Sequence, residues 1–313
     1  MTSGAATSCG GTSSSGDTRF SGGPTSAGGP SPSGVTSTSG APTSSSGVRR
    51  RSVVVTGAGR GIGEATARMF AAAGYLVGAY DLKPCAWAEG DDRVVTGALD
   101  VTDPAAWESA LADFVRNTGG GIDVLVNNAG TLYGTPFMDA SYEQDALLVD
   151  VNVKGVLYGC RAAFPYLLKG TGPAVINVGS ASAIYGQAEM ATYSATKFAV
   201  RGITEALDLE WGPQGVLVSS VWPLYVGTQL LDGVDTAGMK NMGVNLTEDD
   251  VATEIVHVAE KAGRRGSGLL GRIRDAITDG VHQPVGRQAT AMYLASQVVP
   301  GRIIKFANTR LTS

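Results

Sequence analysis

Residues 52–63 read SVVVTGAGRGIG and divide into a short strand and a glycine turn. Four of the first five residues are β-branched, a run typical of a strand, and the glycines mark a tight turn. Small and apolar residues then recur at the spacing of one helix face: Ile62, Ala65, Thr66, Met69, Phe70 and Ala73. In this order, a strand, a glycine turn and a helix let backbone N–H groups and the helix dipole face a pyrophosphate.

An acidic residue supports the interpretation of this turn as a dinucleotide site. Asp81 ends a second apolar run, 18 residues after Gly63. A carboxylate that binds the ribose hydroxyls is expected about 20 residues beyond the glycine motif. Asp81 therefore favours NAD, because its charge would repel the 2′-phosphate of NADP.

The rest of the chain alternates strands and helices. Further strands are expected at five nearly continuous apolar runs: residues 75–80, 93–99, 122–127, 174–178 and 216–221. Two long helices are expected at residues 141–168 and 191–211. A third helix is expected to begin at Thr247 and Asp250, which have the spacing of a capping box, and to continue to Ala262. Apolar strands separated by helices predict a single Rossmann-type, doubly wound parallel sheet with helices on both faces. Beyond Gly266 the pattern gives no clear seventh strand, and a helical C-terminal extension is expected.

Composition divides the 313 residues into three parts. Of residues 1–48, 41 are Ser, Gly, Thr, Pro or Ala. A segment of this composition buries too little apolar surface to offset the entropy of ordering the chain. We expect a disordered tail over residues 1–50, a dinucleotide-binding catalytic domain over 51–264 and a C-terminal extension over 265–313. The tail is a plain extension or an organelle transit peptide.

Charge and cysteine content exclude several function classes. The net charge of −4 and isoelectric point of about 5.3 argue against a cationic surface for nucleic acid. Three cysteines without CxxC spacing and two histidines far apart predict no metal site and a reducing compartment. No apolar run approaches the ~18 residues of a membrane span. A cytoplasmic protein is expected, with organelle targeting by the tail as the alternative.

Tyr193 and Lys197 lie four residues apart on an expected helix, so both project from one face. A phenol titrates near ~10, and a neighbouring ammonium favours its phenolate. The pair is then suited to exchange a proton with an alcohol or carbonyl oxygen. In isolation, this spacing is more often a solvated helix face.

Together these motifs resemble the short-chain dehydrogenase/reductase family, in its non-extended branch, from about Arg51 to Ala262. Residues 56–63 are similar to the family's TGxxxGxG, residues 127–130 to its NNAG and residues 193–197 to its YxxxK. Asp100-Val101 resembles the pair that family members use near the adenine.

The resemblance implies the catalytic residues Asn152, Ser180, Tyr193 and Lys197. Ser182 is a rival for the serine role, and Asn152 alternatively bends its helix. The implied cofactor-binding residues are Gly57, Gly59, Arg60, Gly61, Ile62, Gly63, Asp81, Asp100, Val101, Asn128, Ala129, Gly130, Tyr193, Lys197, Pro223, Val226 and Thr228. Leu224 departs from the family pattern, which has glycine there.

The resemblance implies an oxidoreductase that interconverts a secondary alcohol and a ketone with NAD. Arg60 complicates the choice of cofactor, because a basic residue at its position resembles a mark of NADP-using members. Two alternatives follow: an NADP-dependent 3-oxoacyl reductase and, in a different class, a non-catalytic dinucleotide-binding regulator.

Apolar residues dominate the segment between Thr228 and Thr247, which resembles the family's substrate lid. They favour a lipid-like or cyclic small-molecule substrate over sugars and hydroxy acids, although they can equally pack within the lid. Small residues line one side of the helix at 191–211: Ala195, Ala199, Gly202 and Ala206. They allow close approach of the sheet or of another subunit, and the resemblance favours a homo-oligomer, a dimer or a tetramer.

Overall fold

The computed structural model describes residues 49–231, 234, 236–263 and 280–299, together with residues 303 and 309. These residues belong to one unit of the chain, Thr43–Ser313. The tail predicted over residues 1–50 lies outside the described residues, except for Arg49 and Arg50.

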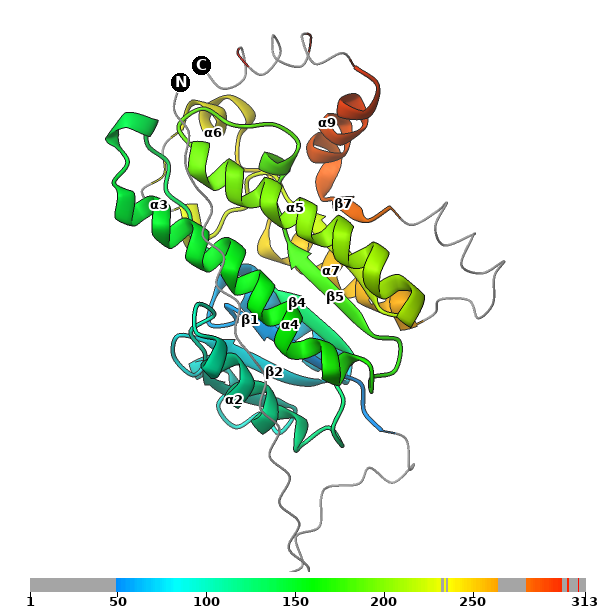
Figure 1. Cartoon of the computed structure of the whole chain (residues 1–313). Helices are drawn as coiled ribbons and strands as arrows, with labels where there is room; N and C mark the ends of the chain where they lie inside the picture. The colour runs from blue at the N-terminus through cyan, green and yellow to red at the C-terminus, as the bar shows by residue number, and fades with distance from the viewer. Residues whose placement is uncertain are drawn as a thin grey trace, which may run out of the picture. The chain divides into compact units, whose positions relative to one another are not determined.

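A parallel sheet of seven strands forms the centre of this unit, in the order β3-β2-β1-β4-β5-β6-β7 (Figure 1). The strands are β1 (Ser52–Thr56), β2 (Leu76–Asp81), β3 (Val94–Ala98), β4 (Val124–Asn127), β5 (Ala174–Val178), β6 (Leu217–Trp222) and β7 (His282–Pro284). Every pairing is parallel. The strand order reverses between β1 and β4, and ligands of such sheets bind in the crevice at this point.

Helices cover both faces of the sheet, which confirms the doubly wound fold (Figure 1). They are α1 (Gly61–Ala72), α2 (Pro104–Val115), α3 (Tyr142–Val149), α4 (Gly155–Leu167), α5 (Ala191–Trp211), α6 (Ala237–Met242), α7 (Glu248–Gly263) and α9 (Gly286–Val298). Alternate residues of β1 enter opposite cores: Val53 packs with Phe70 of α1 and Ile255 of α7, whereas Val54 packs with Trp107 of α2.

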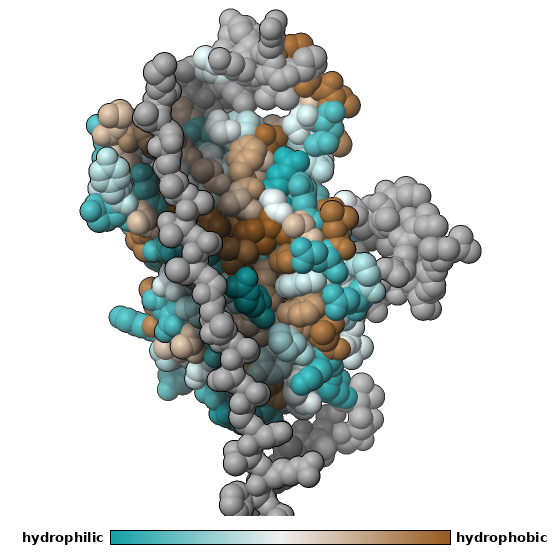
Figure 2. Space-filling view, viewed as in Figure 1, coloured by the Kyte–Doolittle hydropathy of each residue, from teal (hydrophilic) through white to brown (hydrophobic). Residues whose placement is uncertain are grey.

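The outward face of α4 and α5 keeps apolar side chains at the surface. Leu157 of α4 and Phe198 and Leu209 of α5 are exposed, and Figure 2 shows apolar residues among polar ones on the face that carries these helices. The small residues of α5 also point outward: Ala195, Gly202 and Ala206 are exposed, and nothing lies within 4 Å of a Cβ placed on Gly202. These small residues therefore do not serve close approach to the sheet.

One expected helix differs from the structure. Residues 141–168 were expected to form a single helix, but a π-helical segment, Asp150–Lys154, separates α3 from α4. The side chain of Asn152 within it is hydrogen-bonded to the main chain of Thr131, with Oδ1 accepting from N at 2.8 Å and Nδ2 donating to O at 2.9 Å. These bonds fix the bulge at the place where the chain leaves β4, and such bulges are frequent at functional sites.

β7 is the strand that the sequence did not reveal. Residues 282–284 pair with β6, and α9 follows, so the described part of the C-terminal extension contains a strand as well as a helix. His282 is buried, with Nδ1 2.7 Å from Ser220 Oγ and Nε2 2.9 Å from Glu205 Oε1. Its ring stacks on Trp222 at 4.3 Å. Burial lowers the pKa of His282, against the opposing effect of Glu205. His282 therefore joins the extension to β6 and α5 as a neutral imidazole.

Candidate active site

The turn between β1 and α1 depends on glycine at three positions. Gly57 and Gly61 have φ of +63° and +61°, a region that favours glycine. A Cβ on Gly63 would lie 2.0 Å from the carbonyl oxygen of Gly57. The start of the turn and the first turn of α1 therefore pack backbone against backbone.

The residues after β4 fasten this turn. The Asn128 side-chain amide donates to the carbonyl oxygens of Thr56 (2.9 Å) and Gly57 (3.1 Å). Thr56 Oγ1 in turn accepts from the backbone N–H groups of Asn128 and Ala129. Asn127, one residue earlier, donates to Asn177 Oδ1 inside the sheet. The Asn128 contacts hold the two edges of the crevice at a fixed separation.

Asp81 faces the glycine turn from the end of β2. Its Oδ2 accepts from Gly59 N at 2.8 Å, and its Oδ1 accepts from Leu82 N at 2.7 Å. Arg60 points elsewhere, since its guanidinium donates to Gln229 Oε1 at 2.7 Å. The acidic and basic groups that gave conflicting indications of the cofactor thus have different partners.

These elements enclose a solvent-open cleft of about 1140 Å³. Eleven of the residues expected to bind the cofactor line it: Gly57, Arg60, Gly61, Ile62, Asp81, Asp100, Val101, Asn128, Ala129, Gly130 and Thr228. Gly59 and Gly63 lie in the turn behind this wall. The bare backbone of the glycine turn suits the pyrophosphate of a dinucleotide, and the adjacent Asp81 carboxylate suits a ribose, so the residues fit that group.

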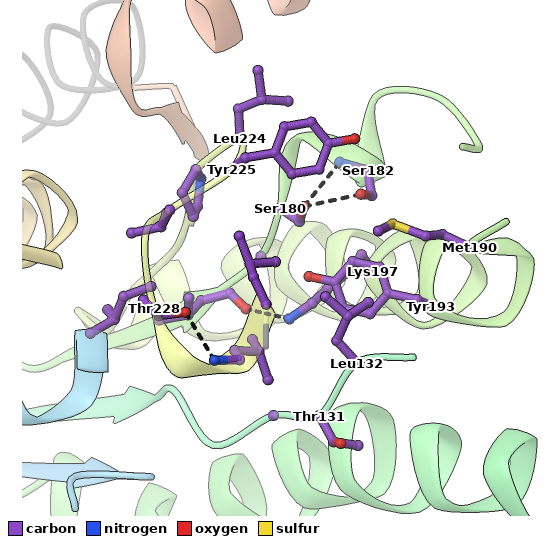
Figure 3. A pocket seen from close by; sticks show the side chains of 18 of the residues that line it. Thr131, Leu132, Ser180, Ser182, Met190, Tyr193, Lys197, Leu224, Tyr225 and Thr228 are labelled. Atoms are coloured by element: carbon purple, nitrogen blue, oxygen red, sulfur yellow. Dashed lines mark hydrogen bonds between the residues drawn. The ribbon is translucent and has the colours of Figure 1, made fainter. Parts of the chain in front are cut away.

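A second cavity, of about 710 Å³, adjoins this cleft and contains the catalytic candidates (Figure 3). Ser180 follows the end of β5, and Tyr193 and Lys197 lie one turn apart on α5. All three line the cavity, and Lys197 Nζ donates to the carbonyl oxygen of Val178 at 2.9 Å. The Lys197 ammonium lies 5.6 Å from the centre of the Tyr193 ring.

Burial determines the charge state of this pair in the chain alone. It raises the pKa of Tyr193 to about 12, against the opposing effect of a hydrogen bond with Ser180. Burial also lowers the pKa of Lys197 to about 8. The sequence argument expected the ammonium to favour the phenolate, but desolvation has the larger effect here. At neutral pH Tyr193 is therefore a proton donor and Lys197 is largely charged.

Both candidate serines reach the cavity. Ser180 Oγ lies 3.1 Å from Ser182 Oγ and also accepts from Ser182 N at 3.1 Å. Ser180 lowers the pKa of Tyr193, against the larger effect of burial. Ser182, in the short helix η4 (Ala181–Ala183), also lines the cavity and is hydrogen-bonded to Ser180.

Asn152 lies beside the catalytic helix without a described hydrogen bond to Lys197. Besides its two bonds to Thr131, its Nδ2 is 3.2 Å from Thr196 Oγ1, one residue before the lysine. It is buried within the π-helical segment, so the alternative role of bending the helix also corresponds to an observed feature.

The loop after β6 closes the cavity from the other side. Pro223, Val226 and Thr228 line it, and Val226 forms a β-bridge with Leu246. Leu224 occupies the wall where glycine was expected. The other apolar lining residues are Ile62, Leu132, Val178, Met190, Leu230 and Leu231.

One polar residue of this cavity, Gln187, was missed in the sequence. Gln187 is buried and accepts a hydrogen bond from the Tyr225 hydroxyl at 3.3 Å, and Tyr225 lines the same cavity. Gln187 lies in a loop without a motif, so only the fold brings it to the cavity.

Comparison with known proteins identifies the fold and its chemistry. The family model of the short chain dehydrogenases matches residues 51–237, more than half of the chain. The chain belongs to the short-chain dehydrogenase family. Among its relatives is the 3-alpha-(or 20-beta)-hydroxysteroid dehydrogenase of Mycobacterium tuberculosis, 37% identical over 186 residues, which cover 58% of this chain and 71% of that protein. L-2,3-butanediol dehydrogenase of Corynebacterium glutamicum is 36% identical over 208 residues, 63% of this chain and 80% of that protein.

A solved structure agrees with this membership. The 3-ketoacyl-(acyl-carrier-protein) reductase of Brucella melitensis, complexed with NADH, is 27% identical and has a TM-score of 0.65, with 75% of this chain and 96% of that chain covered. This short-chain dehydrogenase is therefore an oxidoreductase that acts on CH–OH groups of a small-molecule substrate with a nicotinamide dinucleotide. Within the described residues, none of the helices has the length and apolar character needed to cross a membrane.

Proposed function

We propose that the chain is an NAD-dependent dehydrogenase that interconverts an apolar secondary alcohol and its ketone, with Tyr193 as the acid and base. The observation that carries this proposal is the placement of Tyr193 and Ser180 in one largely apolar cavity that adjoins the cleft suited to a dinucleotide. A binding protein without catalytic function has no need of a buried phenol next to a buried amine.

Each residue has a distinct role in the proposed reaction. The nicotinamide, when bound, supplies or accepts the hydride. Ser180 and Tyr193 bind the substrate oxygen and polarise its bond to carbon. Tyr193 donates its proton to that oxygen during reduction and accepts it during oxidation. Lys197, near its ring, supplies positive charge that favours the phenolate and is placed to hold the ribose.

The remaining motif residues have positioning roles in this proposal. Asn152 connects the chain after β4 to the catalytic helix, and we propose that it supports proton exchange near Lys197. Pro223, Val226 and Thr228 would hold the nicotinamide end of the cofactor from the loop after β6. Asp100 and Val101 would flank the adenine at the far end of the cleft.

NAD is the proposed cofactor because of the placement of Asp81 and Arg60. Two backbone N–H groups fix the Asp81 carboxylate at the end of the cleft, where it can accept from ribose hydroxyls. A 2′-phosphate there would meet this negative charge. The Arg60 guanidinium, which would attract such a phosphate, is bonded to Gln229 instead.

The lining of the cavity supports an apolar substrate. Leu132, Met190, Leu224, Leu230 and Leu231 form much of its wall, and the only lining ammonium or guanidinium is that of Lys197 among the described residues. Without a further cation to hold a phosphate or carboxylate, a cyclic or lipid-like alcohol fits better than a sugar acid or a hydroxy acid.

A homo-oligomer is also proposed. The outward face of α4 and α5 exposes Leu157, Phe198 and Leu209 next to small residues that allow another helix to approach. This face suits a second copy of the chain. Sedimentation of the purified protein gives its mass, and a monomer at micromolar concentration would contradict this part of the proposal.

The function is tested by a screen of nicotinamide reduction with NAD and with NADP. The panel contains cyclic and lipid-like secondary alcohols, 2,3-butanediol, sugars and hydroxy acids, and 3-oxoacyl thioesters are assayed in the reverse direction. Tyr193→Phe, prepared in parallel, controls for contaminating activity. We expect NAD-dependent oxidation that is greatest for the apolar alcohols. A kcat/KM that falls as substrate hydrophobicity rises, or one that is at least as high with NADP, would overturn the corresponding part.

A further inference from the structure

Glu189 has a backbone conformation that glutamate normally avoids. Its φ is +64°, and it is the only residue other than glycine with positive φ in the described part of the chain. In this region a Cβ lies too close to the neighbouring carbonyl oxygen, so glycine is favoured there. Such strain persists only where the surroundings stabilise it, and it often occurs at functional sites.

The backbone and the side chain of Glu189 hold two different segments. Its carbonyl oxygen accepts from Thr135 N at 2.8 Å, in the loop that follows β4. Its carboxylate Oε2 accepts from Ala237 N at 3.2 Å, in the first turn of α6. The carbonyl contact is available to any residue, including glycine. The contact with α6 requires a side chain of sufficient length with an acceptor oxygen.

α6 is part of the cover of the catalytic cavity. Met239 and Met242 pack against an apolar cluster that contains Tyr193, Met190 and Tyr225. All three of these residues line the cavity. The placement of α6 therefore determines how closely the walls of the cavity are supported.

Neighbouring contacts hold α6 in the same place. Thr236 caps α6 through a bond from Met239 N. The Tyr185 hydroxyl lies 3.9 Å from Met242 Sδ. A Cβ on Gly134 would lie 2.7 Å from Val234 Cγ1, so the loop after β4 touches the segment before α6. The bond that Ala237 N donates to the Glu189 carboxylate is charge-assisted, and it joins α6 directly to the loop before α5.

We propose that Glu189 is a positioning residue that fixes α6 over the substrate cavity and thereby favours large apolar alcohols over small ones. This inference rests on the proposed function for its kinetic consequence but not for its structural one. A substrate that fills the cavity gains from a fixed wall, because apolar contacts are lost when a gap opens. A small alcohol bound only at Ser180 and Tyr193 does not.

Glu189→Gly separates this role from a structural one. Glycine relieves the unfavourable φ and keeps the carbonyl bond to Thr135, but it removes the carboxylate. If Glu189 acted only through its backbone, this variant would be at least as stable as the wild type, with unchanged exchange in α6 and unchanged kinetics. Glu189→Gln is the matched variant, because it keeps the length of the side chain and one acceptor oxygen.

The first readout is hydrogen–deuterium exchange of peptides that cover residues 236–247, measured on the full chain without substrate or cofactor. We expect about tenfold faster exchange in Glu189→Gly and exchange close to wild type in Glu189→Gln, as loss of one hydrogen bond to a charged group implies. Exchange in Glu189→Gly equal to that in the wild type would overturn the proposal, whether or not the chain oxidises any alcohol.

The second readout is kinetic, on the best bulky alcohol and the best small alcohol of the panel. For Glu189→Gly we expect an approximately tenfold higher KM for the bulky substrate, with kcat and NADH affinity unchanged, and little change for the small one. For Glu189→Gln we expect a KM for the bulky substrate close to that of the wild type. Equal effects on both substrates would overturn the selectivity part. If Glu189→Gly does not fold, Glu189→Asn, which tolerates positive φ but has a shorter side chain, is compared in its place with the same expectations.

Discussion

The dinucleotide cleft and the substrate cavity adjoin each other but are built from different parts of the chain. Backbone and glycine form the first: Gly57 and Gly63 pack against Asn128, which follows β4, and a single methyl group at Gly63 would collide with a carbonyl oxygen. Side chains form the second, which is lined by leucines, Met190 and tyrosines. The first therefore has little freedom to vary, whereas the second can change its selectivity without changing the fold.

The largest effect of this difference is expected at Gly63. Gly63→Ala places a Cβ 2.0 Å from the Gly57 carbonyl oxygen, so the turn must open. Overpacking of this kind costs about 3 kcal/mol, which predicts NADH affinity lower by about 100-fold. Gly212→Ala is the matched control, since Gly212 also has a helical backbone conformation and nothing lies within 4 Å of a Cβ placed on it. Fluorescence titration with NADH measures both, and equal affinities would show that the cleft is more adaptable than described.

A smaller effect is expected where the cleft does use a side chain. Asp81→Asn keeps the size of the side chain and removes the negative charge that, in our proposal, faces the ribose. The ratio of kcat/KM with NAD to that with NADP should then fall by about tenfold, or 1.4 kcal/mol. Arg60→Met should change the ratio little, because its guanidinium is bonded to Gln229. A larger shift from Arg60→Met than from Asp81→Asn would reverse the assignment of these two residues.

The pH dependence tests the pair at the boundary between the two regions. Reduction requires the Tyr193 proton and the Lys197 charge. The pKa values of about 12 and about 8 keep both in place below pH 8, so kcat/KM for reduction should be flat there. Above pH 8 Lys197 loses its proton, and the rate should fall toward one decade per pH unit.

Oxidation should respond in the opposite direction, because it requires Tyr193 without its proton. Its rate should rise up to about pH 8 and level off above it, because the transition state that it shares with reduction also uses the Lys197 charge. Lys197→Arg keeps its positive charge over this pH range. The reduction rate of this variant should therefore not fall above pH 8, whatever its absolute value. A reduction rate that increases with pH would contradict these roles.

The same division explains what the sequence predicted. The dinucleotide cleft depends on local motifs, so the glycine turn, Asp81 and the strands around them were predictable from spacing. The catalytic helix, Ala191–Trp211, was placed correctly because its apolar face and its Tyr-Lys pair lie within one element.

The features that sequence missed depend on contacts between distant residues. The π-helical segment is fixed by bonds from Asn152 to Thr131, 21 residues away. β7 has only three residues, and its placement depends on His282 meeting Ser220, 62 residues away. The positive φ of Glu189 is contrary to its residue type and follows from its partners, Thr135 and Ala237. Local pattern contains none of this information.

The central claim is that cofactor binding depends mainly on the dinucleotide cleft, whereas proton transfer depends on the Tyr193 phenol in the substrate cavity. It is tested most directly by the turnover of Tyr193→Phe with NAD and the best alcohol of the panel, measured with the NADH affinity of the same preparation. The ring remains and only its hydroxyl is lost, so we predict a kcat lower by about 10²–10⁴-fold with NADH affinity nearly unchanged. Retention of more than about a tenth of kcat would contradict the account, because the proton would then come from another residue.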